Sequence, residues 1–194
     1  MKNFTRVSLF VAIAVLVTAN VATAGYISSF AVRNSHDASH YSIETNLQVG
    51  DYFYNDRTHT TFTSLTAGLL GADHVATASD DSSEANFELD ITVGPVDGTL
   101  YYVHRPAPWS VLPDWVAAGG WTLSSQDGET GEPNWEALDM YELAVAAGST
   151  TTVYEHPGWS YHVVGVAIPE PGSITLLVMG LLGLATRRSP RQPK

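Results

Sequence analysis

The chain has 194 residues, contains no cysteine and carries a formal net charge of −11 at pH 7. This length suits one domain of ordinary size, and the lack of cysteine excludes disulfide bonds, thiolate metal sites and cysteine nucleophiles. The charge is uneven, because residues 25–168 hold 19 of the 20 acidic residues against three arginines and no lysine, a formal charge of −16. Such a surface repels phosphate backbones, so the composition argues against nucleic-acid binding.

The first 24 residues have the three parts of a secretory signal peptide. Lys2 and Arg6 form a positive start, residues 7–17 form a short apolar segment, and Ala22 and Ala24 form a small-residue cleavage signal. A permanent N-terminal anchor is the alternative, which the short apolar segment and the small-residue site disfavour. We therefore expect signal peptidase to cut after Ala24 and the exported domain to span residues 25–168.

Alternation with a period of two dominates the first half of this domain. A strand rich in β-branched and aromatic residues is expected over 58–65. In the segment 87–93, apolar residues at every second position alternate with glutamate, aspartate and threonine, the pattern of a half-buried strand. Turn residues at 94–98 lead to another strand over 99–105, and we expect the two strands to pair as a hairpin.

The second half of the domain continues in the same way. Pro113 and the pair Gly119–Gly120 enclose one predicted helical turn. Residues 124–136 are polar and rich in turn formers, so we expect a long loop there. Further strands are predicted at 141–145, from Thr150 onward and at 161–168. Many short strands joined by Gly and Pro turns indicate a mainly β protein, an antiparallel β-sandwich, with a barrel as the alternative.

The C-terminal segment differs in composition from the domain. Pro169, Glu170 and Pro171 precede an uncharged apolar run over 172–186 and a basic tail over 187–194, which contains Arg187, Arg188 and Arg191. As a helix the run would span roughly 22 Å, short of a ~30 Å hydrocarbon core, but snorkelling arginines and local thinning close such a gap. A buried helix of the domain is the alternative. The positive-inside rule would leave the arginines in the cytoplasm.

This arrangement resembles the PEP-CTERM sorting signal of Gram-negative bacteria, with Ile168 in place of the more common valine before the motif. The resemblance implies that residues 169–194 are recognised by an exosortase, a membrane-embedded cysteine transpeptidase that removes the transmembrane helix near the motif. It also implies an inner-membrane-tethered precursor, later delivered to the cell envelope or matrix, and an association with exopolysaccharide and biofilm.

The central part loosely resembles a β-sandwich module appended to secreted bacterial proteins, including polysaccharide-active enzymes. The segment 51–93 carries the resemblance, although serine and aspartate stand where a lysine commonly follows. It implies a galactose-binding-like or jelly-roll-like sandwich and no defined chemistry. The matching positions are Asp56, Arg57, Leu70, Gly71, Ala72, Asp73, Thr77, Ala78 and Asp80.

For Asp56 and Arg57 in this set, we favour a structural role. A buried arginine in so acidic a domain needs a carboxylate partner, for which Asp80 and Asp73 are the candidates.

Two groups of residues could bind a metal ion. Asp80, Asp81 and Glu84 are weak calcium candidates, because carboxylate oxygens suit Ca²⁺ but no D-x-D-x-D-G loop is present. His36 and His40 have the spacing of a zinc pair on a helix, yet lie among loop residues. We therefore expect no resident cofactor, with calcium as the exception to test.

The remaining chemistry favours binding over catalysis. No H-E-x-x-H or G-x-S-x-G motif occurs, and carboxylate pairs are uninformative in so acidic a chain. Trp109 and Trp135, flanked by loop formers, are candidates for stacking on sugar rings, against a role in packing. We expect a non-enzymatic envelope or matrix protein. A carbohydrate-binding module and a secreted glycan-active hydrolase are the alternatives.

Overall fold

The computed structural model describes residues 26–106, 111–132, 137–155 and 161–167. Within these ranges, two short 3-10 helices and one short α-helix interrupt a chain of strands. The elements are β1 (Ile27–Arg33), η1 (Ala38–His40), β2 (Ser42–Glu44), β3 (Tyr52–Tyr54), β4 (Arg57–Leu65), β5 (Asp73–Ala76), η2 (Asp80–Ser83), β6 (Glu88–Val93), β7 (Gly98–His104), α2 (Asp114–Ala118), β8 (Thr122–Thr130), β9 (Ala137–Val145), β10 (Thr150–Tyr154) and β11 (Tyr161–Ala167).

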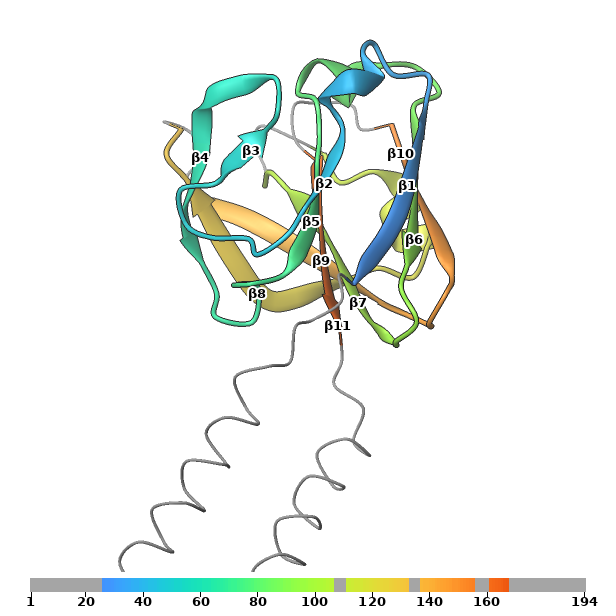
Figure 1. The fold of residues 1–194 in the computed structure, drawn as a ribbon. Helices are drawn as coiled ribbons and strands as arrows, with labels where there is room; N and C mark the ends of the chain where they lie inside the picture. Colours follow the sequence, from blue (N-terminus) through green and yellow to red (C-terminus); the bar gives the residue numbers. More distant parts are fainter. Residues whose placement is uncertain (1–25, 107–110, 133–136, 156–160, 168–194) are drawn as a thin grey trace, which may run out of the picture.

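The strands form two sheets. The smaller sheet has the order β1-β6-β10, and the larger has the order β2-β5-β11-β7-β9-β8-β4-β3. Every pair of neighbouring strands is antiparallel. Figure 1 shows the smaller sheet on one side of the molecule and β3, β4 and β8 on the other. The expectation of a mainly β fold built from antiparallel sheets is confirmed.

The first of two hydrophobic clusters fills the space between the sheets. Leu89, Ile91 and Val93 of β6 are buried while the residues between them are half-buried, so the predicted alternation is confirmed. They pack with Leu100 and Tyr102 of β7. Burying each such side chain stabilises the fold by roughly 1.5–3 kcal/mol.

The second cluster lies on the opposite face of the larger sheet. It joins Val103, Met140 and Val164 of the central strands to Phe53 of β3 and Phe62 of β4. Strands β7, β9 and β11 are therefore covered on both faces. This explains why β7 is buried at most positions and does not simply alternate.

The larger sheet curls until its two ends meet. Tyr54 of β3 forms a parallel bridge with Thr77, which follows β5. The backbone N–H of Asn55 donates to the carbonyl of Thr77 at 2.9 Å. The sandwich therefore includes a sheet that nearly closes on itself around the second cluster.

Both ends of the described domain lie at one pole of the sandwich. Ala167 at the end of β11 pairs with Gly98, and the N–H of Gly94 donates to the carbonyl of Tyr26 at 2.7 Å. A side chain at Gly98 would meet the ring of Tyr26 at 2.5 Å, as well as the carbonyl of Val166. Only glycine fits where the first and last strands approach β7.

Two expectations about local structure are wrong. Strands β6 and β7 form no hairpin, because β6 belongs to the smaller sheet and β7 to the larger. The connection at 94–97 is a corner between sheets: Gly148 N–H donates to Gly94 O, and the Asp97 carboxylate accepts from Ala147 N–H. The turn residues at 94–97 correctly indicate that the chain turns between β6 and β7. They do not determine which strands β6 and β7 pair with.

The expected loop at 124–136 is the second error, because Thr122–Thr130 is strand β8. Its side chains are largely exposed and polar, so no apolar alternation marks it in the sequence. Pairing with β9 on one edge and β4 on the other holds it in the sheet. The predicted helical turn is confirmed as α2, which Pro113 precedes and Gly119 follows.

Several predictions fall outside the described residues. These are the signal peptide at 1–24, the motif at 169–171, the apolar run at 172–186, the basic tail at 187–194, and the residues Trp109 and Trp135. Within the described ranges, no helix has the length and apolar character needed to cross a membrane.

Candidate functional site

An open cleft of about 410 Å³ lies between β2, β3 and β5, which Figure 1 shows side by side. It lies at the seam where the curled sheet nearly closes. Residues of β2 and its continuation form one wall, β3 and its flanks form the other, and β5 contributes two buried residues. The lining residues are Glu44, Thr45, Asn46, Gln48, Asp51, Tyr52, Asn55, His74 and Ala76.

Strand pairing fixes the cleft wall nearest β5. Glu44 of β2 is opposite His74 of β5, so the two residues are neighbours by register. After β2 the chain turns at Asn46, which has a positive φ of 65°. The buried Leu47 then anchors the wall, since its N–H donates to Ala72 O and its carbonyl accepts from Gly71 N–H, both at 2.9 Å.

The opposite wall is held by the turn before β3. The carboxylate of Asp51 accepts from the N–H of Gln48 at 2.7 Å, which closes a short turn. Gly50 at the tip has a φ of +99° and donates its N–H to Phe62 O at 2.8 Å. Tyr52 follows with 49% of its surface exposed, although both residues after it are buried.

Polar side chains in the cleft are ordered by contacts with one another. The amide of Asn55 donates to the hydroxyl of Ser42 at 3.0 Å, and that hydroxyl donates to Glu44 Oε1 at 2.7 Å. The amide of Gln48 donates to Asn46 Oδ1 at 3.1 Å. One oxygen each of Glu44 and Asp51 therefore accepts a protein donor, which orients both carboxylates in the cleft.

His74 is 3% exposed on β5. Its burial lowers the pKa of the imidazole below the ordinary value, although the carboxylates of Asp51, Glu44 and Asp73 act in the opposite direction. The lowered pKa favours the neutral form of the imidazole. Among the described residues that line the cleft there is no lysine or arginine, and the carboxylates of Glu44 and Asp51 make this lining acidic.

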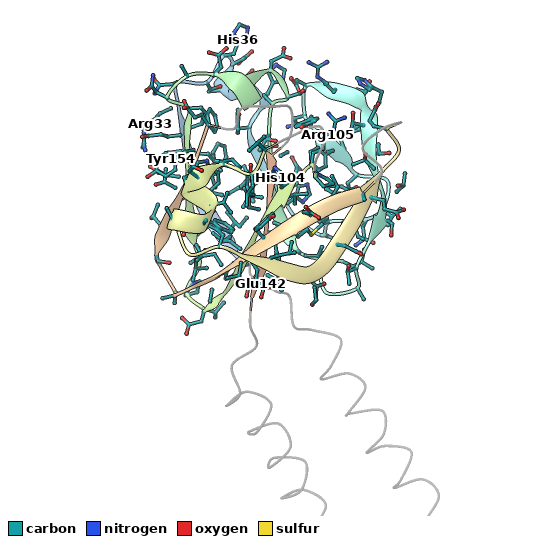
Figure 2. All side chains as sticks on the ribbon, turned by 180° about the vertical axis from the view of Figure 1, so that it is seen from behind. Arg33, His36, His104, Arg105, Glu142 and Tyr154 are labelled. Atoms are coloured by element: carbon teal, nitrogen blue, oxygen red, sulfur yellow. The ribbon has the colours of Figure 1, made fainter. Side chains whose placement is uncertain are left out.

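A smaller hollow of about 210 Å³ lies at the end of the sandwich where Figure 2 labels His36. Its lining includes the metal candidates His36, His40, Asp80 and Asp81, but not Glu84. Asp81 is fully buried there, and its carboxylate accepts from Ser35 Oγ at 2.6 Å, Tyr41 OH at 2.9 Å and the N–H of His36. The carboxylate of Asp81, one of the weak calcium candidates, therefore already accepts hydrogen bonds from three protein donors.

The neighbouring carboxylates also have protein partners. Asp80 pairs with Arg57, which confirms one of the two partners expected for that arginine. Asp56 accepts from the N–H groups of Ser79 at 2.9 Å and Asp80 at 3.3 Å. The other expected partner, Asp73, instead accepts from Ile27 N–H at 3.0 Å.

The backbone N–H of Glu84 donates to the carbonyl of Asp81. His40 lies 3.6 Å from the Asp37 carboxylate. Among the described residues, no three His, Cys, Asp or Glu side chains are grouped so as to hold a metal ion. The calcium and zinc hypotheses stay predictions without geometric support.

Tryptophans in the described ranges serve packing. Trp121 is 6% exposed, and Trp115 donates its indole N–H to the carbonyl of Glu155 at 3.1 Å. Their rings contact Tyr102 edge-on. The exposed aromatic beside the cleft is Tyr52, which sequence reasoning missed; its position between Asp51 and Asn55 in "DYFYN" was the available signal.

The fold and the cleft define a class: a β-sandwich with a polar cleft whose described lining is acidic. The chain carries the PEP-CTERM protein-sorting motif at residues 167–189, which confirms the resemblance found at the C-terminus. That motif marks an exported, exosortase-sorted extracellular protein, anchored transiently in the membrane before the exosortase cuts.

Solved structures support the fold. A β-glucuronidase from glycoside hydrolase family 2 is similar over 74% of this chain, with a TM-score of 0.59 and 13% identity. A GH138 enzyme targeting pectin rhamnogalacturonan II is similar over 72% of this chain, with a TM-score of 0.48 and 9% identity. The matches cover only 15% and 16% of those proteins, so the first likeness shows the sandwich fold alone. No curated protein matches this chain.

Proposed function

We propose that this protein is a non-enzymatic component of the cell envelope or extracellular matrix that associates with exopolysaccharide of a biofilm. One observation carries the proposal: the sorting motif begins at residue 167, the last residue of β11. A folded domain is thus joined directly to its sorting signal. An antiparallel sandwich of the galactose-binding-like or jelly-roll-like kind is a suitable module for display outside the cell.

The absence of catalysis is part of the proposal. The carboxylates of Asp56, Asp73, Asp80 and Asp81 accept hydrogen bonds or form ion pairs that hold strands and turns together. Groups engaged in this way support the structure, which favours a display or binding role over hydrolysis.

Intact-mass analysis of the exported protein tests the sorting step. We expect the mature form to begin after Ala24 and to lack the residues C-terminal to the 169–171 motif. Replacement of Glu170 by Gln should leave the longer form in the inner-membrane fraction. A mature wild-type protein that retains Arg187 and Arg188 would contradict processing.

A second candidate function, carbohydrate binding, is favoured by the cleft of about 410 Å³ with its polar lining and exposed Tyr52. Binding through Trp109 and Trp135 stays a prediction, since both residues lie outside the described ranges. Retention on the organism's own exopolysaccharide without release of reducing ends would separate binding from hydrolysis.

A further inference from the structure

We propose that the cleft between β2, β3 and β5 binds one end or turn of an uncharged glycan, with Tyr52 as the platform for a sugar ring. This assignment rests on the proposed role in the envelope or matrix and gives that role a site and a ligand class. Four properties of the cleft carry it: its size, its polar groups, the exposed ring of Tyr52 and its charge.

The size of the cleft suits a small part of a larger ligand. Its volume of about 410 Å³ falls within the range of roughly 300–1,000 Å³ typical of small-molecule sites. The cleft is partly open to solvent. A polysaccharide chain can therefore place one part in the cleft while the rest stays outside.

The polar groups match a polyhydroxyl ligand. Sugar hydroxyls both donate and accept hydrogen bonds, and the cleft offers both functions on neighbouring side chains. Glu44 and Asp51 supply carboxylate acceptors, while the amides of Asn46, Gln48 and Asn55 supply donors and acceptors. Because Ser42 holds Glu44 and the Gln48 N–H holds Asp51, the acceptors are positioned before a ligand arrives.

Tyr52 supplies the apolar surface that a sugar ring requires. Nearly half of its surface is exposed, whereas its neighbours Phe53 and Tyr54 are 0% and 1% exposed. Its backbone is fixed because β3 pairs with β4 at Tyr52 and Thr61. An aromatic ring with an apolar face and a polar hydroxyl, held on a strand, can stack on sugar C–H groups at low entropic cost.

Charge selects among glycans. A uronic acid, sulfate or phosphate group would need a lysine or arginine partner, and the described part of the chain places none in the cleft lining. The nearest candidate in sequence, Arg57, pairs with Asp80 at the smaller hollow. Glu44 and Asp51 would repel an anionic ligand, so charge disfavours anionic sugars, while the amides and Tyr52 offer contacts that a neutral sugar can use without a charge.

The test uses the purified full chain in a zwitterionic detergent, because detergents with sugar head groups would compete for the cleft. The probes are immobilised oligosaccharides in three sets: neutral hexoses and N-acetylhexosamines, uronic acids, and unacetylated glucosamine. We expect binding to members of the neutral set and none to the uronic set. Replacement of Tyr52 by Ala should weaken that binding at least tenfold, and replacement of Gln48 by Ala should weaken it by a smaller factor.

The matched control is Tyr154→Ala, which removes a tyrosine of similar exposure (41%) from the smaller sheet. It should bind like the wild type. Each variant's thermal unfolding is recorded, and Gln48→Ala serves as the cleft variant if Tyr52→Ala fails to fold. Both cleft side chains are exposed, so we expect folded variants.

Three outcomes would overturn the assignment. They are no binding to the neutral set, preference for the uronic or glucosamine sets, or neutral binding that folded Tyr52→Ala and Gln48→Ala leave unchanged. The sorting proposal has its own readout, the intact mass of the exported protein, so failure of the glycan site and failure of sorting are distinguishable.

Discussion

The backbones of Tyr54 and Thr77 form a parallel bridge, and through it the two ends of the eight-stranded sheet meet. Tyr54 belongs to β3, the last strand in the order of that sheet, whereas Thr77 directly follows β5, the second strand. This single contact creates the seam in which the cleft lies. The site therefore depends on how the sheet curls and not on any local motif.

The carboxylate of Asp81 should be important for stability. Replacement by Ala removes a fully buried carboxylate, which accepts from the hydroxyls of Ser35 and Tyr41 and from the N–H of His36. We expect a loss of roughly 3 kcal/mol in the free energy of unfolding, measured by urea denaturation. Asp114→Ala, at an exposed position of α2, should change it by less than about 0.5 kcal/mol. Equal effects of the two changes would refute the role of Asp81.

Stability should fall as the pH drops from 7.5 to 5.5. Burial lowers the pKa values of His74 and His104 in the folded protein, against opposing effects of nearby carboxylates that include Asp139 for His104. Below the ordinary pKa of about 6.5, the unfolded chain binds protons that these folded imidazoles do not. The contribution of the two neutral imidazoles to folding stability is therefore complete above pH 6.5. It is lost as the pH falls through the lowered pKa values that they have in the folded protein.

Thermal unfolding across this pH range measures the effect. His74→Gln should flatten the dependence of Tm on pH. His59→Gln is the matched control, because the His59 side chain is 64% exposed and its replacement removes no buried imidazole. A wild-type Tm that is constant between pH 7.5 and 5.5 would contradict the assignment.

Gly98→Ala should destabilise the pole where both ends of the domain meet. The added methyl group would overlap the Tyr26 ring and the Val166 carbonyl, so either the first or the last strand must shift. We expect a cost of about 2 kcal/mol or more by chemical denaturation. Gly131→Ala is the control, since its methyl group would lie 3.4 Å from the nearest side-chain atom, in ordinary contact. If Gly98→Ala left the free energy of unfolding unchanged, the ring of Tyr26 would not be packed closely against residue 98.

Calcium should not stabilise the protein. The oxygens of Asp81 accept from three donors and Asp80 pairs with Arg57, so binding a cation there would break existing contacts. A ligand that binds only the folded state raises Tm with its concentration. We expect the same Tm in excess calcium and in EDTA. A rise in Tm with calcium that Asp80→Asn abolishes would restore the calcium hypothesis.

Local patterns predicted much of the fold. Alternation in β6, the β-branched run of β4 and the Pro and Gly boundaries of α2 are properties of short segments, and each is confirmed. The sequence also limits the expected ion-pair partner of Arg57 to Asp80 or Asp73, because a buried arginine needs a carboxylate partner, and the structure shows Asp80 in that role. The exposed, polar strand β8 escaped prediction, because hydrogen bonds to both neighbouring strands hold it without an apolar pattern.

By itself, the sequence determined that the chain is exported and sorted through a C-terminal signal, because charge, hydrophobicity and a short motif encode such signals in contiguous residues. It also determined a mainly β domain, because alternation is local. Only the tertiary structure decided that β6 and β7 lie in different sheets and that Glu44, Asp51, Tyr52 and His74 line one cleft. Strand pairing and curl depend on contacts between residues far apart in the chain, and no short segment of sequence encodes them.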